Sequence, residues 1–284
     1  MQELDDYISK VKTLPPAPHI LPELLTLLRR DDVDSSRIVQ LISFDPAITA
    51  SVLRLCNSAY FASATPADDL QEAVTRLGFK QVYQLVAAVS GGRLLGPSQK
   101  GYGINTGELW QHSVTAAVAA EIIARSRGDD DSVVFTATLL HDIGKIILAE
   151  ALEHIYTKLV EDSQSQQAAL IETEKRLLGV QHAEIGGRLL ARWNFPPALV
   201  QAIQFHHEPG SAEGDQAKKL AAYVYLGNMI AYFMGFGYGH HAFAVRGRAD
   251  ALDVLGLKPT DLPEFMIQAF EKLQMVETLV KVKL

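Results

Sequence analysis

The chain has 284 residues, of which 48% are apolar and 21% charged, the balance of an ordinary globular protein. Its net charge of −7 argues against extended contact with nucleic acid, because phosphate binding needs a basic surface, but leaves room for a small anionic ligand. Cys56 is the single cysteine, which excludes an internal disulfide and a thiolate cluster and fits a reducing, cytoplasmic compartment.

The first hundred residues are expected to form a series of helices, because no alternating strand pattern interrupts them. The N-terminus, MQELDDYISKVK, lacks the apolar core of a signal peptide. Asp45-Pro46 predicts a helix start, since a capping carboxylate precedes a proline of the first turn. Asp69 with Glu72 predicts another start and Gly78 its end. A further helix is expected from Phe79 to Leu95.

Glycine, proline and serine cluster between Gly91 and Gly107, which predicts a boundary or an exposed connection between two lobes. We expect an N-terminal helical lobe over residues 1–100 and a second helical lobe over residues 101–284. The second lobe is predicted to carry helices near 108–126, 131–149, 151–162, 165–178, 182–193, 196–207, 215–234 and 260–280. The predicted fold class is therefore all-α.

One apolar segment resembles a membrane span. From Leu220 to Val245 there is no Asp, Glu, Lys or Arg, but the segment carries Asn228 and several tyrosines, and its glycines crowd at its end. No second hydrophobic span accompanies it. We interpret it as a buried helix in a large core rather than as a membrane contact.

Six residues that bind metals well lie in predicted helices of the second half. The imidazoles and the carboxylate are poor core fillers, because a buried carboxylate is costly unless it is paired or bound to metal. Imidazole with carboxylate suits iron, manganese, zinc or nickel rather than calcium. The candidate ligands are His112, His141, Asp142, His182, His206 and His207.

Each histidine also has an ordinary interpretation. A lone His112 or His182 would more often be a capping or core residue. His206-His207 fits an exposed helix end, where a cation is favourable near the C-terminal dipole. The apolar setting of His141-Asp142, in LLHDIGKIIL, is harder to explain without a ligand.

The order and spacing of these residues resemble the HD superfamily, especially its HD-GYP branch. The matching motifs are HDIGK (141–145), H-x-x-I-G-x-x-L-L-x-x-W (182–193) and HHE (206–208). The first half resembles the remainder of an HDOD domain in LPPAP (14–18), ISFDPAITASVLRLCNSAYF (42–61) and LQEAVTRLGFKQV (70–82). On these motifs the chain is identified as a member of the HDOD family.

This resemblance implies a helical lobe packed on an HD-type bundle and a role in bacterial signalling with other signalling proteins as partners. It implies a divalent transition metal, with iron or manganese first, zinc or nickel as alternatives, and a di-nuclear centre as the larger set of ligands allows. Many HDOD proteins have a degenerate metal site, whereas this sequence keeps the histidines.

The sequence departs from HD-GYP proteins at two points. No GYP motif follows HHE, and Asn228 stands where active HD hydrolases carry a second aspartate. An amide oxygen can bind a metal but brings no negative charge. A hydrogen bond within a buried helix pair is an equally good explanation of Asn228.

Lys145 follows Asp142 by nearly one helical turn, which would direct both side chains to one site. In HD-GYP proteins the equivalent lysine is associated with substrate phosphate; an ion pair with Glu150 or Glu184 is the alternative.

The motifs and the departures from them are consistent with two functions. The first is a signalling module that acts by ligand or protein interaction. The alternative is a metal-dependent phosphohydrolase of a phosphodiester or nucleotide such as cyclic di-GMP, with Asp142 and Lys145 as catalytic residues.

Overall fold

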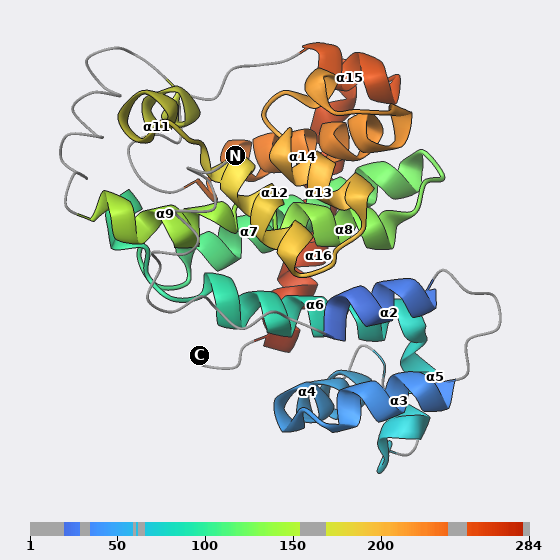
Figure 1. Cartoon of the computed structure of the whole chain (residues 1–284). Helices are drawn as coiled ribbons and strands as arrows, with labels where there is room; N and C mark the ends of the chain where they lie inside the picture. Colours follow the sequence, from blue (N-terminus) through green and yellow to red (C-terminus); the bar gives the residue numbers. More distant parts are fainter. Residues whose placement is uncertain are drawn as a thin grey trace. The chain divides into compact units, whose positions relative to one another are not determined.

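The computed structural model describes residues 20–28, 35–58, 61, 66–153, 169–237 and 249–280, and the side chains of all of these except residues 150–152, 249 and 274–280. The predicted all-α class is confirmed, since within these ranges regular structure is helical apart from one isolated bridge between Gln99 and Ile104 (Figure 1). The helices of the first half are α2 (Ile20–Leu28), α3 (Ser35–Ser43), α4 (Pro46–Cys56), α5 (Leu70–Leu77) and α6 (Phe79–Leu95), followed by the short η1 (Lys100–Tyr102). The later helices are α7 (Glu108–Ser126), α8 (Asp131–Leu139), α9 (Gly144–Leu152), α11 (Leu170–Leu178), α12 (His182–Arg192), α13 (Pro197–Gln204), η2 (Pro209–Ser211), α14 (Asp215–Phe233), α15 (Ala249–Leu255), η3 (Pro259–Asp261) and α16 (Leu262–Val280).

The chain divides into two compact units, with the division between Ser90 and Gly91 inside α6 and again between Phe270 and Glu271 inside α16. The small unit contains α2 to α5, and the large unit contains the helices from α7 to α15. The expected lobe boundary at residue 100 stays a prediction.

The small unit begins its helices as the capping residues predict. Oδ1 of Asp45 accepts hydrogen bonds from the backbone N–H groups of Ala47 and Ile48, at 2.9 and 3.1 Å. Oδ1 of Asp69 likewise accepts from the N–H of Glu72 at 2.8 Å. These bonds satisfy N–H groups that have no partner within the helix.

The glycine-rich segment from Gly91 to Gly107 is more ordered than an exposed connection. Its first five residues continue α6, and Tyr102 and Ile104 are buried. A Cβ on Gly92 would lie 2.6 Å from Nε1 of Trp110, so this glycine makes room for the tryptophan.

The core of the large unit is built on the contact of α7 with α14. A Cβ on Gly227 would lie 2.5 Å from the backbone oxygen of Ala116 and 2.8 Å from Cβ of Ala120. The two helices can approach this closely because both present small residues.

The charge-free segment is buried from Leu220 to Ala231 in α14, as a core helix should be; its part beyond residue 237 lies outside the described residues. Among the described residues one stretch, Asp131–Ala149, is long and apolar enough to cross a bilayer, but 89% of it is buried inside the protein.

Two predicted helices are shorter than expected. The helix predicted over 131–149 is interrupted by a turn at residues 140–143, and the helix predicted to end at His207 stops at Gln204. In both turns a histidine N–H and its ring Nδ1 bond to the carbonyl oxygen three residues earlier, Thr138 for His141 and Ile203 for His206. These bonds take carbonyls that the next helical turn would otherwise use, so the histidines end their own helices. The helix predicted near 151–162 lies mostly outside the described residues, and the one predicted from 165 is described from Leu170 onward.

Candidate metal centre

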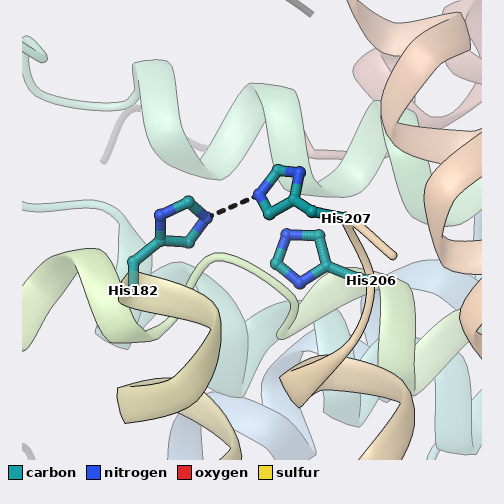
Figure 2. A group of neighbouring side chains, drawn as sticks. All are labelled: His182, His206 and His207. Carbon is teal, nitrogen blue, oxygen red and sulfur yellow. Dashed lines mark hydrogen bonds between the residues drawn. The ribbon is translucent and has the colours of Figure 1, made fainter. Parts of the chain in front are cut away.

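Six candidate ligands gather in two groups within the large unit. His112 of α7 lies with His141 and Asp142 of the turn before α9, and their ligand atoms all lie within 4.8 Å of one another. His182, the first residue of α12, forms an equally close group with His206 and His207 of the turn after α13. Figure 2 shows the three rings of this second group turned toward one another.

The glycines of α9 and α12 allow the two groups to meet. A Cβ on Gly144 would lie 1.8 Å from the backbone oxygen of His182 and 2.8 Å from the backbone nitrogen of Gly186. No larger residue fits at position 144, and the turn that holds His141-Asp142 can therefore lie against the start of α12.

Asp142 joins the two groups. Its Oδ2 lies 3.4 Å from Nε2 of His141 and 3.8 Å from Nε2 of His112, and its Oδ1 lies 3.2 Å from Nε2 of His182. In the second group, Nε2 of His207 lies 3.0 Å from Nε2 of His182 (Figure 2). Two nitrogens bound to one ion at roughly 2.1 Å are about this far apart when they bind at right angles.

The opposite ring nitrogen of four histidines is held by an acceptor. Nδ1 donates to the backbone oxygen of Phe236 in His112 (2.8 Å), of Thr138 in His141 (2.6 Å) and of Ile203 in His206 (2.7 Å). In His182 it donates to the carboxylate of Glu174, at 2.8 Å from Oε2. Because a carbonyl oxygen can only accept, the first three rings carry their proton on Nδ1 and present the lone pair of Nε2.

The residues fit a divalent transition metal. His112, His141, Asp142, His182 and His206 are at most 1% exposed, whereas His207 is half-buried. Among the described residues, Nε2 of His141 and Nε2 of His206 have no hydrogen-bond partner. A buried polar atom without a partner is costly, and an ion bound between these nitrogens and the carboxylate would offset that cost.

Burial lowers the pKa of His112 to about 3 and also lowers the pKa values of His141 and His206. These rings are therefore neutral near pH 7, which is the protonation state that binds metal. For Asp142, burial alone would raise the pKa, but the positive charge of Lys145 and the contact with His182 outweigh it and hold the carboxyl pKa well below its usual range. The aspartate is thus ionised.

Lys145 is directed toward the predicted site. Its Nζ donates to Oδ2 of Asp142 at 2.7 Å, and the lysine is buried. Glu184, one of the alternative partners, pairs instead with Lys175 at 3.0 Å.

Asn228 is buried on α14, and its Oδ1 has no hydrogen-bond partner within the described part of the chain. It lies one turn before Tyr232, whose ring centroid is 5.0 Å from that of His112. Residues four apart share one helix face, so Asn228 belongs to the face of α14 that borders His112. Its role as a ligand stays a prediction.

Two residues of the site, Glu174 and Tyr102, were not predicted from the sequence. Glu174 is fully buried on α11 and contacts His182, and the hydroxyl of Tyr102 donates to Oε1 of Glu174 at 2.9 Å. In the sequence, Glu174 lies in LIETEKRLL, which has the charge pattern of an exposed helix. The one sequence feature that could have indicated a role for Glu174 at the site is that it lies only eight residues before His182.

Comparison with known proteins gives one family and several similar folds. A model of the HDOD domain matches residues 14–209. An uncharacterised protein of Treponema pallidum is 30% identical over 227 residues, which are 79% of this chain and 43% of that protein. The chain thus spans less than half the length of this curated relative.

Two solved structures share the fold. A provisionally assigned phosphohydrolase of Shewanella amazonensis has a TM-score of 0.68 and 26% identity, with 95% of this chain and 92% of that chain covered. A provisionally assigned signal transduction protein of Marinobacter aquaeolei has a TM-score of 0.74 and 22% identity, with 99% and 65% covered.

Proposed function

Because this chain belongs to the HDOD domain family, we propose that it is a bacterial signal-transduction module that carries a divalent metal centre and acts through ligand or protein interaction. The observation that supports metal binding best is the convergence of the Nε2 atoms of His112, His141 and His182 on the two carboxylate oxygens of Asp142. Cytoplasmic signalling proteins are the partners that this function would need.

The proposed ligands are His112, His141 and Asp142 for one ion and His182, His206 and His207 for a second, with Asn228 as a neutral contributor. Iron or manganese is our first choice, because both accept mixed imidazole and carboxylate ligands. Such an ion supplies Lewis acidity and a concentrated positive charge that attracts an anion. The near-complete burial of most of these side chains favours a small anionic ligand over a bulky one.

Metal content tests the proposal directly. Purified protein should contain a first-row transition metal, and His141→Ala and Asp142→Ala should lose it while keeping their helical circular dichroism. Asp129→Asn is a matched control, because Asp129 also pairs with a lysine, Lys219 at 2.8 Å, but does so away from the histidines. Elemental analysis that finds no metal in carefully prepared wild-type protein would contradict the proposal.

Hydrolysis of a phosphodiester is the alternative function. The contact of Lys145 with Asp142 favours it, since a lysine beside the metal ligands is suited to offset phosphate charge, and so does the likeness to the Shewanella protein. Turnover of cyclic di-GMP and of an aryl phosphodiester with iron or manganese separates the two functions. Turnover that disappears in Asp142→Ala would replace the signalling proposal, whereas metal-loaded protein without turnover would support it.

A further inference from the structure

Glu174 is a buried carboxylate in contact with one of the proposed metal ligands. It is fully buried, and it accepts hydrogen bonds from the hydroxyl of Tyr102, from the backbone N–H of His182 and from Nδ1 of His182. Within the described part of the chain, its ion-pair partner is His182, at 2.8 Å, and no lysine or arginine pairs with it. A buried carboxylate needs a positive charge nearby, and the hydrogen bonds alone supply only part of that compensation.

The two groups of candidate ligands differ in charge. His112 and His141 share their group with Asp142, whereas the group of His182, His206 and His207 consists of imidazoles. The charge of Asp142 is also offset by Lys145 at 2.7 Å. Oδ1 of Asp142 also reaches Nε2 of His182, at 3.2 Å, so Glu174, which is hydrogen-bonded to Nδ1 of the same ring, adds a second carboxylate to the three-histidine group.

We infer that Glu174 is a positioning residue for the second of two metal positions, and that it gives this position negative charge. The second position is formed by His182, His206 and His207. This inference rests on the proposed metal binding. Glu174 holds the imidazole of His182 through Nδ1 and leaves its Nε2 toward the centre, at 3.2 Å from Asp142 and 3.0 Å from His207. A carboxylate behind a histidine ligand fixes the ring and makes its other nitrogen a stronger donor.

Glu174→Gln isolates the charge. The glutamine has nearly the same shape, its oxygen can accept from both nitrogens of His182, and its amide can donate to the Tyr102 hydroxyl. A role confined to packing or hydrogen bonding would leave metal binding unchanged. Titration of metal-free protein with Co²⁺, followed by absorption and by elemental analysis, should give two tightly bound ions per wild-type chain and one tightly bound ion per Glu174→Gln chain, whose second ion binds more weakly. At the second position the affinity should fall by about 10- to 100-fold.

Two control variants complete the experiment. Tyr102→Phe removes one hydrogen bond but keeps the charge, so it should still bind two ions. Glu174→Asp also keeps the charge and should bind two ions even if Glu174→Gln folds poorly. Two ions of unchanged affinity in Glu174→Gln, or a single ion in Glu174→Asp, would overturn the inference and leave the proposed metal binding intact. Wild-type protein that takes up no Co²⁺ would instead overturn the proposed function, and the inference with it.

Discussion

At the scale of single residues, polar side chains that are buried or half-buried account for much of what is specific to this molecule. Each has partners that hold it: Asp142 contacts Lys145, and His182 contacts Glu174. Asp129, between α7 and α8, is the clearest case away from the histidines. It accepts hydrogen bonds from Nζ of Lys219 at 2.9 Å and from the hydroxyl of Tyr223, both on α14.

Asp129→Asn should lower the free energy of unfolding by about 1 kcal/mol at pH 7, since it removes a partly exposed ion pair and weakens a hydrogen bond. Partial burial would raise the pKa of Asp129, but the bonds from Lys219 and Tyr223 outweigh it and lower that pKa. A carboxylate with a lowered folded-state pKa contributes its full stability above its unfolded pKa, roughly 4. That contribution is lost as the pH falls through the folded-state value.

Urea unfolding of wild type and Asp129→Asn, both with chelator, checks this from pH 7 to pH 2.5. The difference should be constant above about pH 5 and shrink in acid. A difference that persists unchanged at pH 2.5 would rule out the ion pair as its source.

At the scale of elements, the positions of the helices were largely predictable and two of their ends were not. Asp45-Pro46 and Asp69 mark helix starts by local chemistry, and the structure confirms both. The breaks at residues 140–143 and 205–207 were missed because apolar residues continue through them and the bonds that end these helices come from histidine rings. A search for periodicity does not detect such bonds.

The candidate site, too, was predictable in part. The histidines, Asp142 and Lys145 were recognisable because polar residues in apolar segments stand out in a sequence. Glu174 was not, because its burial depends on its contact with His182 at the start of α12, which no local pattern in LIETEKRLL encodes. Features set by neighbouring residues, such as helix caps, can be predicted from a sequence. A contact between two helices can be identified only once the fold is known.

Gly144→Ala should separate α9 from α12, because the added methyl group would overlap the backbone oxygen of His182. Backbone cannot yield as a flexible side chain can, so we expect a loss of at least about 2 kcal/mol of stability together with loss of bound metal. Thermal unfolding and elemental analysis measure both. Gly210→Ala is the control, since its Cβ would find its nearest neighbour at 3.5 Å, an ordinary contact. A stable Gly144→Ala protein with full metal content would show that this helix contact is not needed.

At the scale of the whole molecule, all the proposed ligands belong to the large unit, so metal should stabilise that unit specifically. Both tryptophans of the chain, Trp110 and Trp193, also lie there. Their fluorescence therefore reports on the large unit, whereas far-ultraviolet circular dichroism reports helices of both units. Chains with two units need not unfold in a single step, so the two signals can differ.

Metal at 100 times its dissociation constant should add about 2.7 kcal/mol to the stability of the unit that binds it. For a unit of this size that corresponds to a rise of roughly 5–10 °C in the midpoint followed by tryptophan fluorescence. Melting curves with metal and with excess chelator provide the measurement, and His141→Ala should abolish the shift. An identical midpoint in both conditions would contradict metal binding by the large unit.

The paired histidine turns also bear on protein engineering. In each, a ring closes onto the carbonyl oxygen three residues before it, so the direction of Nε2 is set within four consecutive residues, from Thr138 to His141 and from Ile203 to His206. The orientation of the imidazole in such a histidine turn is therefore set mainly by local hydrogen bonds. A helix of an unrelated scaffold that ended in the same histidine turn would present an imidazole that is already oriented for metal binding. The turn could therefore be transferred to designed metalloproteins.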